Sequence, residues 1–79
     1  MTLKIISAEE ILFEGDVKIV HLPGGEGDFT VLQNHASLIS TLTEGVIRYI
    51  PSDEEHEHAT EISGGIADVD NNIVSVCIY

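Results

Sequence analysis

The stretch from Leu22 to Ile39 reads Leu-Pro-Gly-Gly-Glu-Gly-Asp-Phe-Thr-Val-Leu-Gln-Asn-His-Ala-Ser-Leu-Ile. Pro and three glycines end the first apolar run, because Pro fixes φ and Gly adopts conformations that other residues avoid. A second short run ends at Val31 and leads into a loop that carries His35. No Lys-Ser or Lys-Thr follows the glycines, so the stretch is not a phosphate-binding loop. The pattern predicts two strands joined by a tight turn.

The rest of the chain repeats this pattern, with short β-rich runs separated by turn residues. No window gives an amphipathic helix, and the pattern is typical of an all-β sandwich. Glycines at five positions mark the expected turns: Gly24, Gly27, Gly45, Gly64 and Gly65. A further turn is expected at Gly15-Asp16. The expected strands are residues 3–7, 11–14, 17–22, 28–31, 38–42, 46–50, 58–62, 66–69 and 74–78.

Length and charge restrict the class of protein. The chain has 79 residues and a formal net charge of −11, which predicts one domain, residues 1–79, that repels nucleic acid and anionic lipid. A domain of this size buries only about 60% of its unfolded surface. Its single cysteine, Cys77, excludes an internal disulfide, so we expect a protein partner to add stability. No signal peptide, transit peptide or membrane-spanning stretch is present, which predicts a cytosolic protein that meets a membrane only through a partner.

Alternation along the expected strands gives a provisional core. In the last strand Val74 and Val76 lie on one face and Ser75 and Cys77 on the other. In residues 17–22, Val20 and Leu22 oppose Ile19 and His21, so this run is largely apolar on both faces. The surplus apolar residues either form a partner surface or are isolated exposed residues of the ordinary kind.

Candidate catalytic and metal-binding groups are few. His56 and His58, with Glu55, Glu57 and Glu61, form the only metal-like cluster. Zinc sites need about four converging ligands, so a solvated acidic hairpin is favoured, and a small metal-dependent enzyme is the alternative. Ser63 before Gly64-Gly65 lacks the Gly-x-Ser-x-Gly pattern of a nucleophile elbow. We therefore predict no catalytic, cofactor-binding or metal-binding residues.

Several motifs, in order along nearly the whole chain, together resemble the epsilon subunit family of F-type ATP synthases. The matching segments are Ser7-Ala8-Glu9, Leu12 to Gly15, Pro23-Gly24, Gly27, Leu32 to Ala36, Leu42, Gly45 to Arg48, and Ser63 to Ile66. One departure is local: the family usually has Pro-Gly before the histidine, and here Gln33-Asn34 precedes His35. Asn tolerates left-handed backbone, so the turn can survive.

The resemblance implies a flattened β-sandwich of about ten strands that acts as a non-catalytic rotor subunit of the central stalk. Its implied partners are the gamma subunit and the polar loops of the membrane c-ring, with Ser7, Asp28 and His35 on the c-ring side. The end carrying the glycine turn and His35 would rest on the ring. The implied location is peripheral, on the cytoplasmic side of the bacterial inner membrane, within the F1 sector.

The resemblance has a second departure, because typical members continue into a C-terminal helical hairpin that restrains ATP hydrolysis. This sequence stops at Tyr79, after the last expected strand, which we interpret as a short form without that inhibition. The isolated chain could also form a homodimer through a vacant gamma-binding surface. A generic acidic β-sandwich adaptor with another protein partner is the alternative function.

Overall fold

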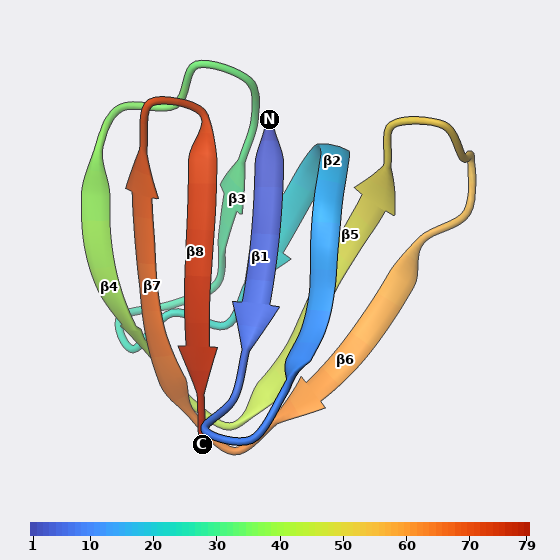
Figure 1. The fold of residues 1–79 in the computed structure, drawn as a ribbon. Helices are drawn as coiled ribbons and strands as arrows, with labels where there is room; N and C mark the ends of the chain where they lie inside the picture. The colour runs from blue at the N-terminus through green and yellow to red at the C-terminus, as the bar shows by residue number, and fades with distance from the viewer.

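The computed structural model describes residues 1–79 and contains eight β-strands and no helix (Figure 1). This confirms the predicted all-β sandwich, with eight strands close to the expected ten. The molecule measures 28 × 25 × 19 Å along its principal axes. The strands are β1 (Thr2–Ile6), β2 (Ile11–Leu22), β3 (Phe29–Val31), β4 (Leu38–Leu42), β5 (Gly45–Pro51), β6 (His58–Ile62), β7 (Gly65–Asp70) and β8 (Ile73–Ile78).

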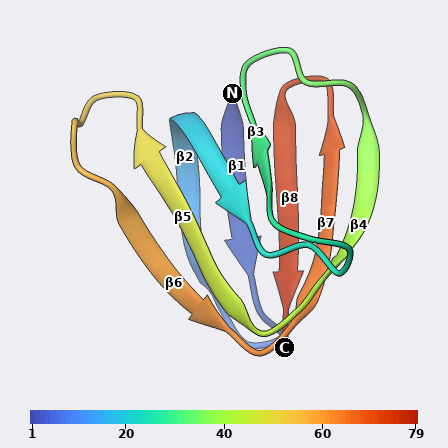
Figure 2. The same cartoon turned by 180° about the vertical axis from the view of Figure 1, so that it is seen from behind.

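The strands form two layers that share β2 (Figures 1 and 2). The first sheet has the order β4-β7-β8-β1-β2, and the second has the order β3-β2-β5-β6. All pairs are antiparallel except β1 with β8, the first and last strands of the chain. This parallel pair places Leu3 beside Val74 and Ile5 beside Val76 at the centre of the first sheet.

The turn expected at Gly15-Asp16 is wrong, because these residues lie inside β2. Gly15 pairs with Leu3 of β1, whereas Val17 onward pairs with β5 and so belongs to the second sheet. The register is irregular between Val17 and Ile19. An irregularity of this kind bends a strand and increases its twist, which β2 needs where it passes from one layer to the other. Two expected strands therefore merge into one.

The core lies between the layers and contains no buried polar or charged residue. The predicted alternation is confirmed: Val74 and Val76 are buried, and Ser75 and Cys77 are exposed. In β2 the side chain of Val20 is fully buried. The buried apolar residues are Met1, Leu3, Ile5, Val17, Val20, Leu22, Val31, Leu42, Ile47, Tyr49, Ile62, Ala67, Val69, Val74 and Val76.

Two of the glycines at the expected turns have clear steric reasons. Gly27 has φ 125°, a conformation that residues with a Cβ rarely adopt. Gly65 is the first residue of β7, and a Cβ there would overlap the carbonyl oxygen of Cys77 on β8. Gly24 lies in the turn between β2 and β3, Gly45 begins β5, and Gly64 lies between β6 and β7.

Candidate functional site

Ser7 holds the turn between β1 and β2. Its hydroxyl accepts hydrogen bonds from the backbone amides of Glu9 and Glu10, both at 3.3 Å. Its own amide donates to the carbonyl of Glu10 at 2.9 Å. These local bonds satisfy backbone hydrogen-bonding groups of the turn without contacts from other strands. Ser7 is half-buried, and its hydroxyl has a structural role. The exposed residues of the turn are the three that follow it, residues 8–10.

Asp28 is an exposed residue between the glycine turn and β3. The turn itself is closed by the amide of Gly27, which donates to the carbonyl of Gly24 at 3.0 Å. The amide of Gly25 donates to the carbonyl of Thr41 at 2.9 Å, which ties the turn to the last residues of β4. Asp28 therefore lies between two fixed segments, the hydrogen-bonded glycine turn before it and β3, which pairs with β2, after it.

His35 lies in the loop between β3 and β4, and its ring bonds the neighbouring backbone. Nδ1 is 2.7 Å from the carbonyl oxygen of Ala36, and since a carbonyl only accepts, Nδ1 carries the hydrogen in this contact. Asn34, with φ 60°, confirms the expectation that asparagine can hold the left-handed position. Asn34 also exchanges two hydrogen bonds with Asn72 in the turn between β7 and β8.

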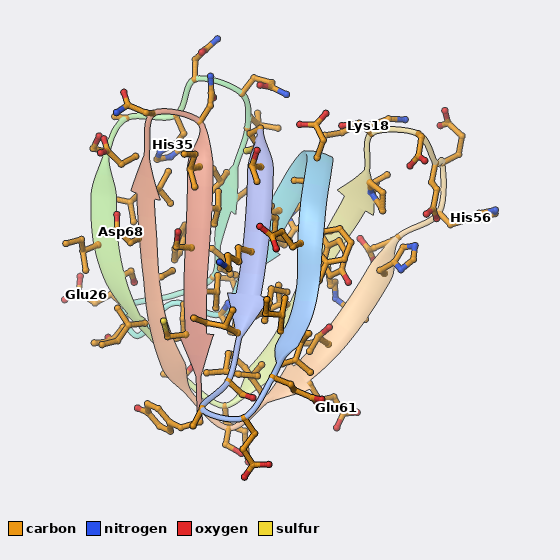
Figure 3. All side chains as sticks on the ribbon, viewed as in Figure 1. Lys18, Glu26, His35, His56, Glu61 and Asp68 are labelled. Carbon is orange, nitrogen blue, oxygen red and sulfur yellow. The ribbon has the colours of Figure 1, made fainter.

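The structure does not bring the three predicted residues together. The turn that holds Ser7 follows Ile6, which pairs with Cys77 near the end of β8. The loop that holds His35 is bonded to Asn72, just before β8 begins. His35 therefore lies at the opposite end of the sandwich from Ser7, and Figure 3 shows it beside the β7–β8 turn. One compact contact cannot include both residues.

The glycine turn lies at the Ser7 end of the sandwich. Gly24 forms a bridge with Leu42, and Leu42 pairs with Gly65, which pairs in turn with Ile78 at the end of β8. The glycine turn and His35 therefore lie toward opposite ends of β3. Strand β3 separates them, because it carries the chain from one end of the sandwich toward the other.

Asp28 and His35 nevertheless both line one open groove of about 700 Å³ between β3 and β4. Phe29, Leu38 and Ile39 give it apolar surface. Glu26 adds a second carboxylate at the glycine turn, and Figure 3 shows it on the β4 side of the molecule. The groove combines apolar and acidic lining residues, which suits a partner with apolar and basic side chains. Sequence reasoning missed it because β3 and β4 meet only through the arrangement of the two sheets.

The residues considered as a metal-like cluster, for which the sequence favours an acidic hairpin, do not converge on one point. Nε2 of His58 is 2.7 Å from Oε1 of Glu54, and its ring stacks on Tyr49 with centroids 5.5 Å apart. His56 is exposed on the loop before β6, where Figure 3 shows it pointing outward. No group of three or more His, Cys, Asp or Glu residues is placed to hold a metal ion. These residues belong to the β5–β6 hairpin and its connecting loop.

Asp16 of β2 contacts two segments that are distant in the sequence, the N-terminus and the residue that follows β5. Its carboxylate accepts a hydrogen bond from the hydroxyl of Ser52 at 2.7 Å and contacts the Met1 ammonium at 3.1 Å. The Ser52 hydrogen bond, followed by that of the ammonium, holds the pKa of Asp16 below its ordinary value. This contact joins β2 to the end of β5, far from the groove.

Some apolar side chains remain outside the core, as expected from runs that are apolar on both faces. On the first sheet Ile39 is 75% exposed and Ile66 is 51% exposed. Ile66 pairs with Cys77, which pairs with Ile6, so three adjacent strands carry an apolar row. The chain has no helix long and apolar enough to cross a membrane.

Known proteins resemble this chain over almost its whole length. A family described as "ATP synthase, Delta/Epsilon chain, beta-sandwich domain" matches residues 1–78. An ATP synthase epsilon chain from Campylobacter lari is 45% identical over 76 residues, covering 96% of this chain and 58% of that relative. One from Desulfitobacterium hafniense is 40% identical over 75 residues, covering 95% and 55%. The chain thus spans a little over half the length of these relatives.

Two solved structures show the same fold. A chain from the mitochondrial ATP synthase of Euglena gracilis, described as OSCP/F1/c-ring, matches with a TM-score of 0.88 and 22% identity. The match covers 96% of this chain and 48% of that one. A chain from the central stalk and c-ring of the Tetrahymena thermophila mitochondrial enzyme matches with a TM-score of 0.83, 13% identity, and coverages of 99% and 62%. At these identities the likeness is one of fold.

Proposed function

We propose, since the chain belongs to the ATP synthase delta/epsilon chain family through its β-sandwich domain, that it is a non-catalytic subunit of the central stalk. In this role it links the gamma subunit to the c-ring and couples ion flow to ATP synthesis. It lies at the membrane surface as part of the F1 sector, on the cytoplasmic side in a bacterium. The observation that carries the proposal is the family match to residues 1–78.

The charge and the surface of the domain support a protein partner. The net charge of −11 favours a neutral or basic surface opposite it. Exposed Ile39 and Ile66, the apolar row on the first sheet, and the groove between β3 and β4 offer apolar contact area. A small domain with these features gains stability when a partner binds its folded state.

Binding to the cognate gamma subunit tests this function directly. We expect co-expression and size-exclusion chromatography to yield a stable one-to-one complex. Failure to form a complex at micromolar concentration would reject the stalk role and favour an acidic adaptor with another partner. The same column, run with the chain alone at increasing concentration, tests whether it forms a homodimer.

The end of the sandwich that carries Ser7 and the glycine turn is our proposed c-ring contact, with Asp28 as its exposed charge. His35 lies at the other end, so we assign it to the groove and leave it out of this contact. Asp53 provides a matched control, because it is also an exposed acid but follows Pro51 at the far end of β5. That end is beside Asp16 and β1's first residue, opposite the glycine turn.

Charge reversal at Asp28 separates this placement from a general charge effect. In membrane vesicles that contain the assembled complex, Asp28→Lys should lower proton pumping per ATP hydrolysed, and Asp53→Lys should not. Both variants should keep the β-sheet circular dichroism spectrum, since both side chains are exposed. Wild-type pumping in Asp28→Lys, or an equal loss in both variants, would remove Asp28 from the c-ring contact.

A further inference from the structure

β4 is an outer strand of the first sheet that pairs with β7 along its length and, on its other side, forms only an isolated bridge between Leu42 and Gly24 (Figure 1). Backbone groups of alternate residues in a strand point to opposite edges. The carbonyl of Thr41 bonds Gly25, which lies on the side away from β7. The N–H and C=O of Ile39, two residues earlier, therefore point to the same open edge. Beyond the Gly25 contact, no backbone bond occupies this edge of β4.

Edge strands in soluble proteins are commonly protected by charged residues, proline, bulges or short length. β3 is protected by its length of three residues, and β6 carries Glu61. β4 reads Leu-Ile-Ser-Thr-Leu, with no charge or proline, and its register with β7 is regular throughout. Before the part of β4 that the glycine turn covers, the edge is therefore unprotected, and Ile39 on it is 75% exposed.

The groove beside this edge accepts the side chains that an added strand would turn inward. Leu38 of β4 and Phe29 of β3 are partly buried and line its apolar surface. Glu26 supplies negative charge at the glycine turn, next to the end of β4. A second copy of this chain, with net charge −11, would be repelled at such a site. A strand that carries Lys or Arg would be attracted.

We propose that β4 receives an extended, basic segment of the gamma subunit as an added strand of the first sheet. Backbone hydrogen bonds to Ile39 hold the segment, and its inward apolar side chains occupy the groove. Its Lys or Arg residues lie against Glu26. This inference rests on the proposed function, because that function names the gamma subunit as partner.

Amide hydrogen exchange in the complex is the direct test. In the free protein the Ile39 amide should exchange rapidly, since it faces the open edge, whereas the amides of β4 that bond β7 should be protected. With the gamma subunit bound, Ile39 exchange should slow at least tenfold. If the wild-type chain does not bind gamma, the proposed function and this inference both fail. If it binds and Ile39 exchange is unchanged, only the strand addition fails.

A pair of substitutions at Ile39 separates the backbone from the side chain. Ile39→Pro removes an N–H that makes no bond to β7, and proline is tolerated at such edge positions. It should weaken gamma binding at least tenfold, whereas Ile39→Thr, which keeps the N–H and the strand propensity, should stay within threefold of wild type. Equal binding by both variants would overturn the proposal. The exchange measurement decides the matter if Ile39→Pro does not fold.

A second pair of variants tests the electrostatic attraction between the groove and a basic segment. Glu26 lines the groove, whereas Glu61 is an exposed acid on β6, at the other side of the molecule (Figure 3). Glu26→Lys should slow association with gamma several-fold more than Glu61→Lys at low salt, and the difference should shrink as salt rises. Equal effects of the two variants would show that only the overall charge matters and would reject a basic segment at the groove.

Discussion

Substitution of Gly65 by alanine tests why the Ser-Gly-Gly segment needs glycine. Gly65 pairs with Ile78, and a Cβ at this position would overlap the Cys77 carbonyl oxygen and lie 3.1 Å from the Ile78 Cα. Both obstacles are backbone atoms, so β7 and β8 must separate locally. Such overpacking costs about 1–3 kcal/mol. Alanine recovers about 0.4–1 kcal/mol by restricting the unfolded chain, so we expect a net loss of about 1–2 kcal/mol.

Urea denaturation measures this loss as a lower midpoint at constant slope. For a domain of this size the melting temperature should fall by about 5–15 °C. Gly15→Ala is the matched control, because its Cβ would meet only the Phe13 ring at 3.2 Å, and a half-buried side chain can shift. That variant should stay within about 0.5 kcal/mol of wild type. Equal stability of the two variants would refute the steric argument.

Two further predictions concern the core and pH. Ile5 is fully buried, so Ile5→Ala should cost about 2–5 kcal/mol in urea denaturation, whereas Ile66→Ala, at a 51% exposed site, should stay within about 0.5 kcal/mol; similar losses would mean that the core is misassigned. The Ser52 hydrogen bond and then the Met1 ammonium hold the pKa of Asp16 in the folded chain below its ordinary value, so its contribution to stability is present above that ordinary value and is lost as pH falls through the folded-state pKa. Asp16→Asn should therefore have a lower urea midpoint than wild type at pH 7 and an equal one near pH 2, and a difference independent of pH would exclude the carboxylate as its source.

The alternation of apolar and polar residues was sufficient to predict most strands and their buried faces. It failed at Gly15-Asp16, where residue types that are typical of turns lie inside a continuous strand. Whether a chain turns back or crosses to another sheet depends on the strands it pairs with, here β1 up to Asp16 and β5 from Val17 onward. These contacts are distant in sequence, so no local pattern could reveal them.

The site was less predictable than the fold, for two different reasons. The separation of His35 from the glycine turn follows from β3 itself, since a strand carries the chain away from the turn that begins it. The sequence contained this information. The groove depends on β3 and β4 ending up as outer strands of different sheets, which follows only from the full strand order. The hydrogen bonds between Asn34 and Asn72, which fix the His35 loop, are likewise non-local.

The two proposed contacts lie on different strands of the first sheet, and the paired strands between them connect the two directly. The c-ring end includes Ser7, between β1 and β2, and the gamma edge is β4, reached from β1 through β8 and β7 by continuous hydrogen-bonded pairs. Since β2 continues from the first sheet into the second, the layers are joined by covalent backbone as well as by the apolar core. A force applied at either contact is therefore carried by paired backbone, without a flexible linker between them.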